Sequence, residues 1–315
     1  MVKFGVEVLT SRDVSYDTLK KLALELERQG FDFAWFNDHM MTFGSPQTPY
    51  IECWTTISAL AAVTTKLRLG SYVLSNPFRH PSLTAKMAAT LDAISQGRLD
   101  FGIGTGWYSP EFTAYGFDFP KPSVRIEQLE EALVLIKKLW TEEKATFRGK
   151  HYHIQDAYCV PKPVQKPHPP VWIGTLIGRK RMFKTIAEYA DGWTLSSIFL
   201  PKPEDYKHEI EQLGEYFRKA GRDVGKLKKA QGIGCVVARD EQELEAKRKK
   251  FPPFKLSFEN YVATQSRVEG TPKRCVEKLK EYVDVGVTHF ILTFPDDITL
   301  EPIRLFGEHV IPAFK

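Results

Sequence analysis

The feature that most constrains the fold of this chain is a repeated alternation of short β-rich runs and longer helical runs. Helical periodicity follows most of the β-rich runs, as in 16–28, 82–94 and 125–140. The runs that we interpret as strands are 2–9, 31–37, 67–74, 99–104, 171–175, 192–197, 230–238 and 288–294. Parallel strands joined by helices define an α/β protein. Eight such units in 315 residues predict a (β/α)8 TIM-type barrel with insertions.

A doubly wound sheet is the structural rival of the barrel. That fold commonly carries a GxGxxG turn after its first strand. The chain has no such turn there, and the number of β-α units also favours the barrel. In a barrel, functional residues lie at the carboxyl ends of the strands, and that rule selects the residues considered below.

Two segments interrupt the alternation. Segment 142–170 contains a hairpin-like stretch at 147–152 and then five prolines, so we interpret it as an extended arm that leads into the fifth strand. Segment 251–270 is rich in aromatic residues and prolines, and we interpret it as an irregular loop that acts as a lid. We therefore predict one domain over 1–315, with an insertion at 142–170 and a lid at 251–270.

Composition excludes several classes of partner. The net charge of +5 comes without a basic stripe interleaved with aromatic residues, so no nucleic-acid partner is expected. The four cysteines are scattered without zinc-type spacing, so neither a disulfide framework nor a metal site is expected. The chain has no apolar stretch of about 18 residues and no signal-peptide pattern at its start, so we expect a cytoplasmic protein that does not span a membrane.

Three polar residues stand where a barrel places its chemistry. Asp38 and His39 follow the second strand, and His39 can exchange a proton near neutral pH. A helix cap or a turn is the alternative for this pair. Glu7 lies within the first strand, where a carboxylate must be paired, protonated or directed into a cavity. A buried ion pair is the alternative for Glu7.

Two glycine-containing turns follow later strands. Gly104, Thr105, Gly106 and Trp107 end the fourth strand, where small residues allow close approach of a planar ligand and the tryptophan supplies an apolar wall. After the fifth strand, a turn opens a helix, and its free N–H groups form a candidate phosphate site. The residues of that turn are Gly174, Thr175, Gly178 and Arg179. A plain βα turn is the alternative.

Segments 90–107, 170–174 and 187–193 together resemble the bacterial luciferase-like monooxygenase superfamily. Segment 35–39, which ends in Asp38 and His39, is similar to the branch that uses coenzyme F420, a deazaflavin. The resemblance implies that Asp38 holds the deazaflavin and that His39 faces the substrate and assists proton transfer. It also implies that the turn from Gly174 to Arg179 binds the cofactor's phosphate.

The family resemblance further implies a strand bulge behind the cofactor ring. Segment 69–73 matches this bulge, which involves Ser71, Tyr72 and Val73. In the family a non-proline cis peptide bond backs the ring, and we predict that bond between Tyr72 and Val73. A homodimer is also implied by the resemblance.

The substrate is a small organic molecule whose identity the sequence leaves open. The family's glucose-6-phosphate and alcohol dehydrogenases have a tryptophan and a glutamate where this chain has Phe43 and Trp107. The strand containing Glu7 resembles methylenetetrahydromethanopterin reductase instead. We therefore expect a reductase-like pocket that is more apolar, formed by Phe43, Trp107 and Trp193.

Two other functions remain open. One is an FMN-dependent, two-component monooxygenase, which has the same fold and phosphate site. The other is a barrel that binds a flavin without catalysis. A nicotinamide-dependent dehydrogenase is disfavoured, because the dinucleotide-binding turn is missing.

Overall fold

We describe residues 1–10, 12–175, 179–196, 202–253, 255–258, 261–264 and 266–315 of a computed structural model. Strands and helices alternate along the chain, and the main sheet consists of parallel strands in the cyclic order of a (β/α)8 barrel. The predicted fold class is therefore confirmed. The barrel strands are β1 (Lys3–Val8), β2 (Phe33–Phe36), β3 (Arg68–Ser71), β5 (Leu99–Gly104), β8 (Val171–Thr175), β9 (Gly192–Ser196), β10 (Lys228–Val237) and β14 (His289–Thr293).

Helices connect the strands, and their boundaries follow local signals. In the first helix, α1, the Ser15 side chain caps the N-terminus by accepting a hydrogen bond from the Thr18 amide. The helix buries one stripe of leucines, and Gly30 follows it with a positive φ of 77°. The helices are α1 (Tyr16–Arg28), α2 (Cys53–Ala61), α3 (Pro81–Ile94), α4 (Ser109–Tyr115), α5 (Pro122–Thr141), α6 (Arg179–Tyr189), α7 (Pro203–Lys219), α8 (Glu241–Lys250), α9 (Pro272–Asp284) and α10 (Glu301–His309).

The chain divides into two compact units. Unit 1 contains 1–9, 15–35 and 175–315, and unit 2 contains 10–14 and 36–174. In unit 1, β10 pairs in parallel with β9 and β14, and β14 pairs with β1. Phe4 of β1 packs between Phe290 of β14 and Phe306 of α10, with ring centroids 5.4 and 5.7 Å away. These rings belong to the buried core of unit 1.

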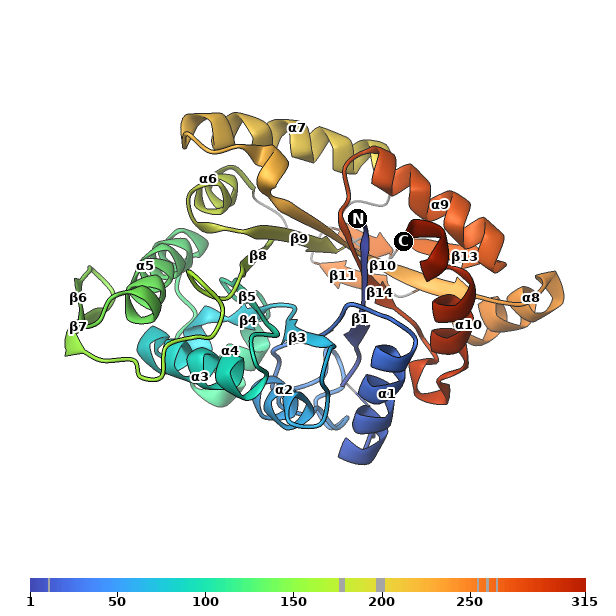
Figure 1. The fold of residues 1–315 in the computed structure, drawn as a ribbon, viewed down its shortest axis with the longest axis horizontal. Helices are drawn as coiled ribbons and strands as arrows, with labels where there is room; N and C mark the ends of the chain where they lie inside the picture. The colour runs from blue at the N-terminus through green and yellow to red at the C-terminus, as the bar shows by residue number, and fades with distance from the viewer. Residues whose placement is uncertain (11, 176–178, 197–201, 254, 259–260, 265) are drawn as a thin grey trace. The chain divides into compact units, whose positions relative to one another are not determined.

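In unit 2, β5 pairs in parallel with β3, β8 and the short strand β4 (Leu74–Ser75). Helices α3 and α5 pack together, and the buried indole of Trp140 donates to the Ala85 carbonyl at 2.9 Å. Segment 142–170 forms the antiparallel hairpin β6 (Ala145–Arg148) and β7 (His153–Ala157) beside α5, as Figure 1 shows. The predicted hairpin in this insertion is thus confirmed.

Segment 251–270 is more regular than the sequence analysis predicts. It contains the antiparallel hairpin β11 (Lys255–Phe258) and β12 (Tyr261–Thr264), and then β13 (Arg267–Gly270), which pairs in parallel with β10. The prediction of an irregular loop is therefore wrong, because β-branched and aromatic residues in these short runs outweigh the nearby prolines. The lid function of this segment stays a prediction.

The described residues include neither a helix suited to span a membrane nor a side-chain cluster suited to hold a metal ion. None of their helices combines the length and the apolar character that a membrane span requires. Nor do they contain a group of three or more His, Cys, Asp or Glu side chains arranged to hold a metal ion.

Candidate functional site

A bulge between β3 and β4 forms the base of the candidate site in unit 2. The peptide bond between Tyr72 and Val73 is cis, which confirms the prediction for this position. The bulge is held at both sides, because the Ser71 hydroxyl donates to the Gly102 carbonyl at 2.7 Å and the Tyr72 amide donates to the Phe36 carbonyl at 2.8 Å. The backbone at 71–73 is therefore anchored to the two flanking strands.

The glycines that end β5 pack against this bulge. A Cβ atom at Gly102 would lie 2.0 Å from the Ser71 carbonyl oxygen, and one at Gly104 would lie 2.9 Å from the Val73 side chain. Gly106 has a φ of +71°, and a Cβ there would meet both Phe112 and the Ser75 hydroxyl at 2.6 Å. Contacts within the protein thus explain why glycine is required. The ligand contact that we expect at Gly104 and Gly106 stays a prediction, as does that of Thr105, which is half-buried beside them.

Asp38 is the centre of a buried network at the end of β2. Its carboxylate is 5% exposed and forms a two-pronged ion pair with Arg79, with N···O distances of 2.8 and 2.9 Å. The Ser75 amide also donates to Asp38 Oδ2 at 2.9 Å, and Arg79 reaches on to Glu52 at 2.7 Å. Oδ2 therefore accepts two hydrogen bonds and Oδ1 accepts one, which leaves Oδ1 with acceptor capacity for a further donor.

His39 is oriented by a buried glutamate that the sequence analysis missed. Glu111, at the start of α4, is 1% exposed, and its Oε2 lies 2.9 Å from His39 Nδ1. Its other oxygen, Oε1, accepts hydrogen bonds from the backbone amides of Met40 and Met41. Because Nδ1 is bonded to a carboxylate, Nδ1 carries the proton and Nε2 is the ring nitrogen that can meet a substrate.

A sequence signal for Glu111 does exist, although it is weak. Pro110 marks the first turn of a helix, and Glu111 is the next residue. This helix begins shortly after the strand end at Gly104 to Trp107 that the sequence already singles out. An acidic residue in a first helical turn usually interacts with free backbone amides. The pairing with His39 could not be inferred, because the two residues are 72 positions apart.

Aromatic rings surround His39 in unit 2. Phe43 packs edge-on against the imidazole with a centroid distance of 4.6 Å, and Tyr50 and Trp107 lie at 6.1 and 6.0 Å. Phe43 also contacts Trp107 at 5.0 Å and Tyr108 at 4.8 Å. The structure therefore places two of the three predicted pocket residues, Phe43 and Trp107, beside the predicted catalytic histidine.

Glu7, Thr175 and Trp193 are among the predicted residues that lie in unit 1. Glu7 is half-buried on β1, and its Oε2 accepts a 2.6 Å hydrogen bond from the Thr293 hydroxyl of β14. Thr175 ends β8 and accepts a 3.0 Å hydrogen bond from the Trp193 indole. Trp193 itself is 0% exposed and stacks on Tyr206 of α7 at 5.3 Å.

The assignment of Trp193 to a substrate pocket is therefore wrong. Its ring is in the core between β9 and the helices, where Phe183 of α6 also contacts it at 6.1 Å. Sequence position after a strand start does not reveal which face of the strand a side chain occupies. In the predicted phosphate turn, Gly174 is half-buried in β8, Arg179 begins α6, and Gly178 lies outside the described residues.

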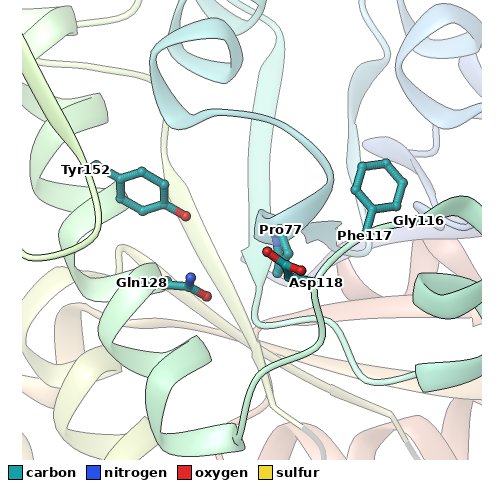
Figure 2. A pocket seen from close by; sticks show the side chains of 6 residues that line it. All are labelled: Pro77, Gly116, Phe117, Asp118, Gln128 and Tyr152. Atoms are coloured by element: carbon teal, nitrogen blue, oxygen red, sulfur yellow. The ribbon is translucent and has the colours of Figure 1, made fainter.

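A cavity of about 290 Å³ opens in unit 2 near the site. It is lined by Pro77, Gly116, Phe117, Asp118, Gln128 and Tyr152 (Figure 2). The Tyr152 hydroxyl accepts a 3.2 Å hydrogen bond from the Asn76 side chain. Asn76 directly follows Ser75, whose backbone amide donates to Asp38. The predicted site residues do not line this cavity, so it lies beside the site and does not contain it.

Sequence comparison agrees with this geometry. A sequence model described as luciferase-like monooxygenase matches residues 1–259, which is most of the chain. The chain belongs to this family. An F420-dependent glucose-6-phosphate dehydrogenase of Kineococcus radiotolerans is 28% identical over 322 residues, covering 94% of this chain and 93% of the relative. An FMNH2-dependent dimethylsulfone monooxygenase of Pseudomonas putida is 27% identical over 348 residues, covering 100% of this chain and 92% of that relative.

A solved structure shares this fold. The structure of a coenzyme F420-dependent tetrahydromethanopterin reductase from Methanopyrus kandleri has a TM-score of 0.81 and 23% sequence identity. The match covers 100% of this chain and 99% of that one. At this level of identity the likeness establishes the barrel fold and leaves the reaction to be argued from the site.

Proposed function

We propose that this luciferase-like protein is an oxidoreductase that uses coenzyme F420 to transfer a hydride to or from a small organic substrate. The observation that carries the proposal is the contact of His39 with the buried Glu111, beside Asp38 at the end of β2. A histidine held in one tautomer next to an apolar surface is suited to proton transfer. The names of the relatives support the cofactor.

The residues of unit 2 fit a bound deazaflavin. The Ser75 hydroxyl is buried and lacks a hydrogen-bond partner within the described part of the chain. It lies next to Asp38, whose Oδ1 retains acceptor capacity. An unpaired buried hydroxyl is costly unless a ligand satisfies it. The two groups together would bind a polar edge that both donates and accepts hydrogen bonds.

The proposed cofactor contacts follow from these positions and from the family resemblance. Asp38 and the bulge would hold the ring, and the turn after β8 would hold the phosphate. The residues assigned to cofactor binding are Asp38, Ser71, Tyr72, Val73, Gly104, Thr105, Gly106, Gly174, Thr175, Gly178 and Arg179.

Coenzyme F420, when bound, supplies or takes the hydride at C5 of its deazaflavin. The protein's task is to orient the reactants, exclude water and move a proton. His39 Nε2 is the proposed proton donor or acceptor. Glu7 is a second candidate, and its likeness to the reductase strand favours a reductase-type reaction.

Titration of the purified protein with F420, FMN and NADPH tests the cofactor assignment. We expect F420 to bind at least tenfold more tightly than FMN, and NADPH not to bind measurably. Dissociation constants from fluorescence quenching of the cofactors give the comparison. Tight binding of FMN alone would replace the proposal with the rival function.

That rival is an FMN-dependent monooxygenase, and the dimethylsulfone monooxygenase relative favours it. It needs the same bulge and phosphate turn, so the pair Asp38 and His39 is the main discriminator. Oxygen consumption in the presence of FMNH2 would support it.

We also propose a homodimer, and the family resemblance is the basis for this proposal. Light scattering of the purified protein tests it.

A further inference from the structure

Four partly exposed aromatic residues gather near His39 in unit 2. The chain has six tryptophans, and five of them are buried, with at most 6% exposed. Trp107 is the exception and is half-buried, as are Phe43 and Tyr108, which contact its ring, and Tyr50, which contacts His39. We call these four residues the aromatic cluster. Partly exposed aromatic side chains that gather at a strand end mark a ligand-binding surface.

We infer that the aromatic cluster binds a planar, conjugated substrate without an anionic group, stacked on the face of Phe43 or Trp107 beside His39. The inference deepens the proposed function and rests on it for the reaction, but not for the binding. The ring centroids of Phe43 and Trp107 are 5.0 Å apart and the ring planes are tilted by 48°, so the rings contact each other and offer two faces that are not parallel. Tyr108 contacts both of them, at 4.8 and 5.5 Å.

The charges around the cluster argue against an anionic substrate on this surface. Glu111 is already hydrogen-bonded to His39 and to two backbone amides. Arg79 is paired with Asp38 and Glu52. The faces of the aromatic rings carry a negative potential that repels anions. A phosphate or carboxylate would therefore lose its hydration here without gaining a compensating partner.

His39 adds one polar contact to the apolar surface. Its Nδ1 is occupied by Glu111, so Nε2 is the nitrogen that meets the ligand. A single ring nitrogen among aromatic walls recognises one oxygen of the substrate, such as a conjugated carbonyl or a phenol. The substrate class is therefore a planar compound with one such oxygen near its ring.

A matched pair of ketones tests the inference. Acetophenone and acetylcyclohexane share the acetyl group and differ in whether the ring is planar and conjugated. Ligand-observed NMR titrations of the full-length protein, with and without saturating F420, give both dissociation constants. We expect acetophenone to bind about fivefold or more tightly than acetylcyclohexane, because its planar ring can stack on an aromatic side chain of the cluster. Glucose 6-phosphate is the anionic comparison and is expected to bind more weakly than acetophenone.

Variants assign that preference to the cluster. Phe43→Leu and Trp107→Leu should each lower the acetophenone preference by about threefold. Tyr158→Leu removes an aromatic ring that is 62% exposed outside the cluster and should leave the preference unchanged. Because the readout is a ratio of two ligands on the same protein, partial unfolding of a variant does not mimic the effect.

Several results would overturn the inference. Equal binding of the two ketones would do so, as would tighter binding of glucose 6-phosphate or an equal loss in Tyr158→Leu. If F420 fails to bind while the acetophenone preference depends on Phe43 and Trp107, the proposed function fails and the substrate class stands. If F420 binds and the preference is absent, the substrate class fails and the proposed function stands.

Discussion

The two ends of the strands in unit 2 each carry a buried aspartate paired with an arginine. At the amino end, Asp100 of β5 pairs with Arg68 of β3 at 2.8 Å. At the carboxyl end, Asp38 pairs with Arg79 at the same distance. The two pairs are chemically alike, and both aspartates are at most 5% exposed.

The pairs differ in what surrounds them. Arg68 also donates to the carbonyls of Gly97 and Leu99 and to the Gln165 side chain. At the amino end, the guanidinium of the pair is therefore hydrogen-bonded by its protein neighbours. The carboxyl end retains the Ser75 hydroxyl, which has no hydrogen-bond partner among the described residues, acceptor capacity on Asp38 and the half-buried aromatic cluster. We propose that the same ion pair serves stability where its neighbours are saturated and serves binding where they are not. This difference follows the division of roles between the two ends of a barrel.

The largest expected effect tests the carboxyl end. His39→Ala should lower kcat by about 10²- to 10⁴-fold, since it removes the proposed proton-transfer group. The dissociation constant of F420 should change much less than kcat. Steady-state kinetics with a cofactor titration on the same preparation separates these quantities. Unchanged turnover would remove His39 from the mechanism.

The second prediction tests the amino end. Asp100→Ala removes the carboxylate that pairs with the Arg68 guanidinium. This change should reduce the free energy of unfolding by about 2–4 kcal/mol. Turnover per folded molecule should stay within about twofold of wild type, because this end lies away from the chemistry. Urea unfolding and activity at 20 °C measure the two. A large loss of turnover in the folded variant would contradict the division of roles.

The third prediction concerns how His39 is held. Glu111→Gln keeps the size of the side chain but weakens the acceptor at His39 Nδ1, so kcat should fall by about tenfold or more. The ¹⁵N shifts of His39 should report a proton on Nδ1 in the wild type and a mixture of tautomers in the variant. A structural role alone would not change the tautomer. The same tautomer in both proteins would leave Glu111 as a loop anchor.

The smallest effect concerns the outer part of the Asp38 network. Burial acts to raise the pKa of Glu52, but hydrogen bonds from the Thr55 and Trp54 amides and the charge of Arg79 outweigh it, and the net pKa is lowered. A lowered pKa means that Glu52 stabilises the fold at pH values above its ordinary value of 4.5 and that this contribution is lost as the pH falls below it.

Glu52→Ala should therefore destabilise the protein at pH 7 by about 1 kcal/mol, because it also removes the N-cap of α2. The difference from wild type should shrink as the pH falls below 4.5. Urea unfolding at several pH values measures it. A difference that does not depend on pH would contradict a stabilising role of the ionised Glu52 carboxylate.

Local patterns predicted much of the fold. The predicted bounds of α1, β5 and β8 agree with the structure, because helical periodicity, capping residues and runs of β-prone residues act within a few positions. The rule that a barrel carries its functional residues at the carboxyl ends of its strands also selected Asp38 and His39. The family resemblance, and not periodicity, supplied the cis peptide at Tyr72.

Partners distant in the sequence were beyond prediction. The contact between His39 and Glu111 joins residues 72 positions apart, and the pair of Asp38 and Arg79 joins residues 41 apart. The burial of Trp193 against α7 depends on which face of β9 meets the helix. None of these follows from a local pattern.

The repeat of strand and helix was therefore enough to determine the barrel and to place a histidine and an aspartate at its carboxyl end. The tertiary structure decided which groups hold that histidine, which side chains stay half-exposed around it and which tryptophan faces the core. The physical reason is that secondary structure depends on neighbours in the sequence. Hydrogen bonding and burial depend instead on neighbours in space, which exist only once the chain has folded.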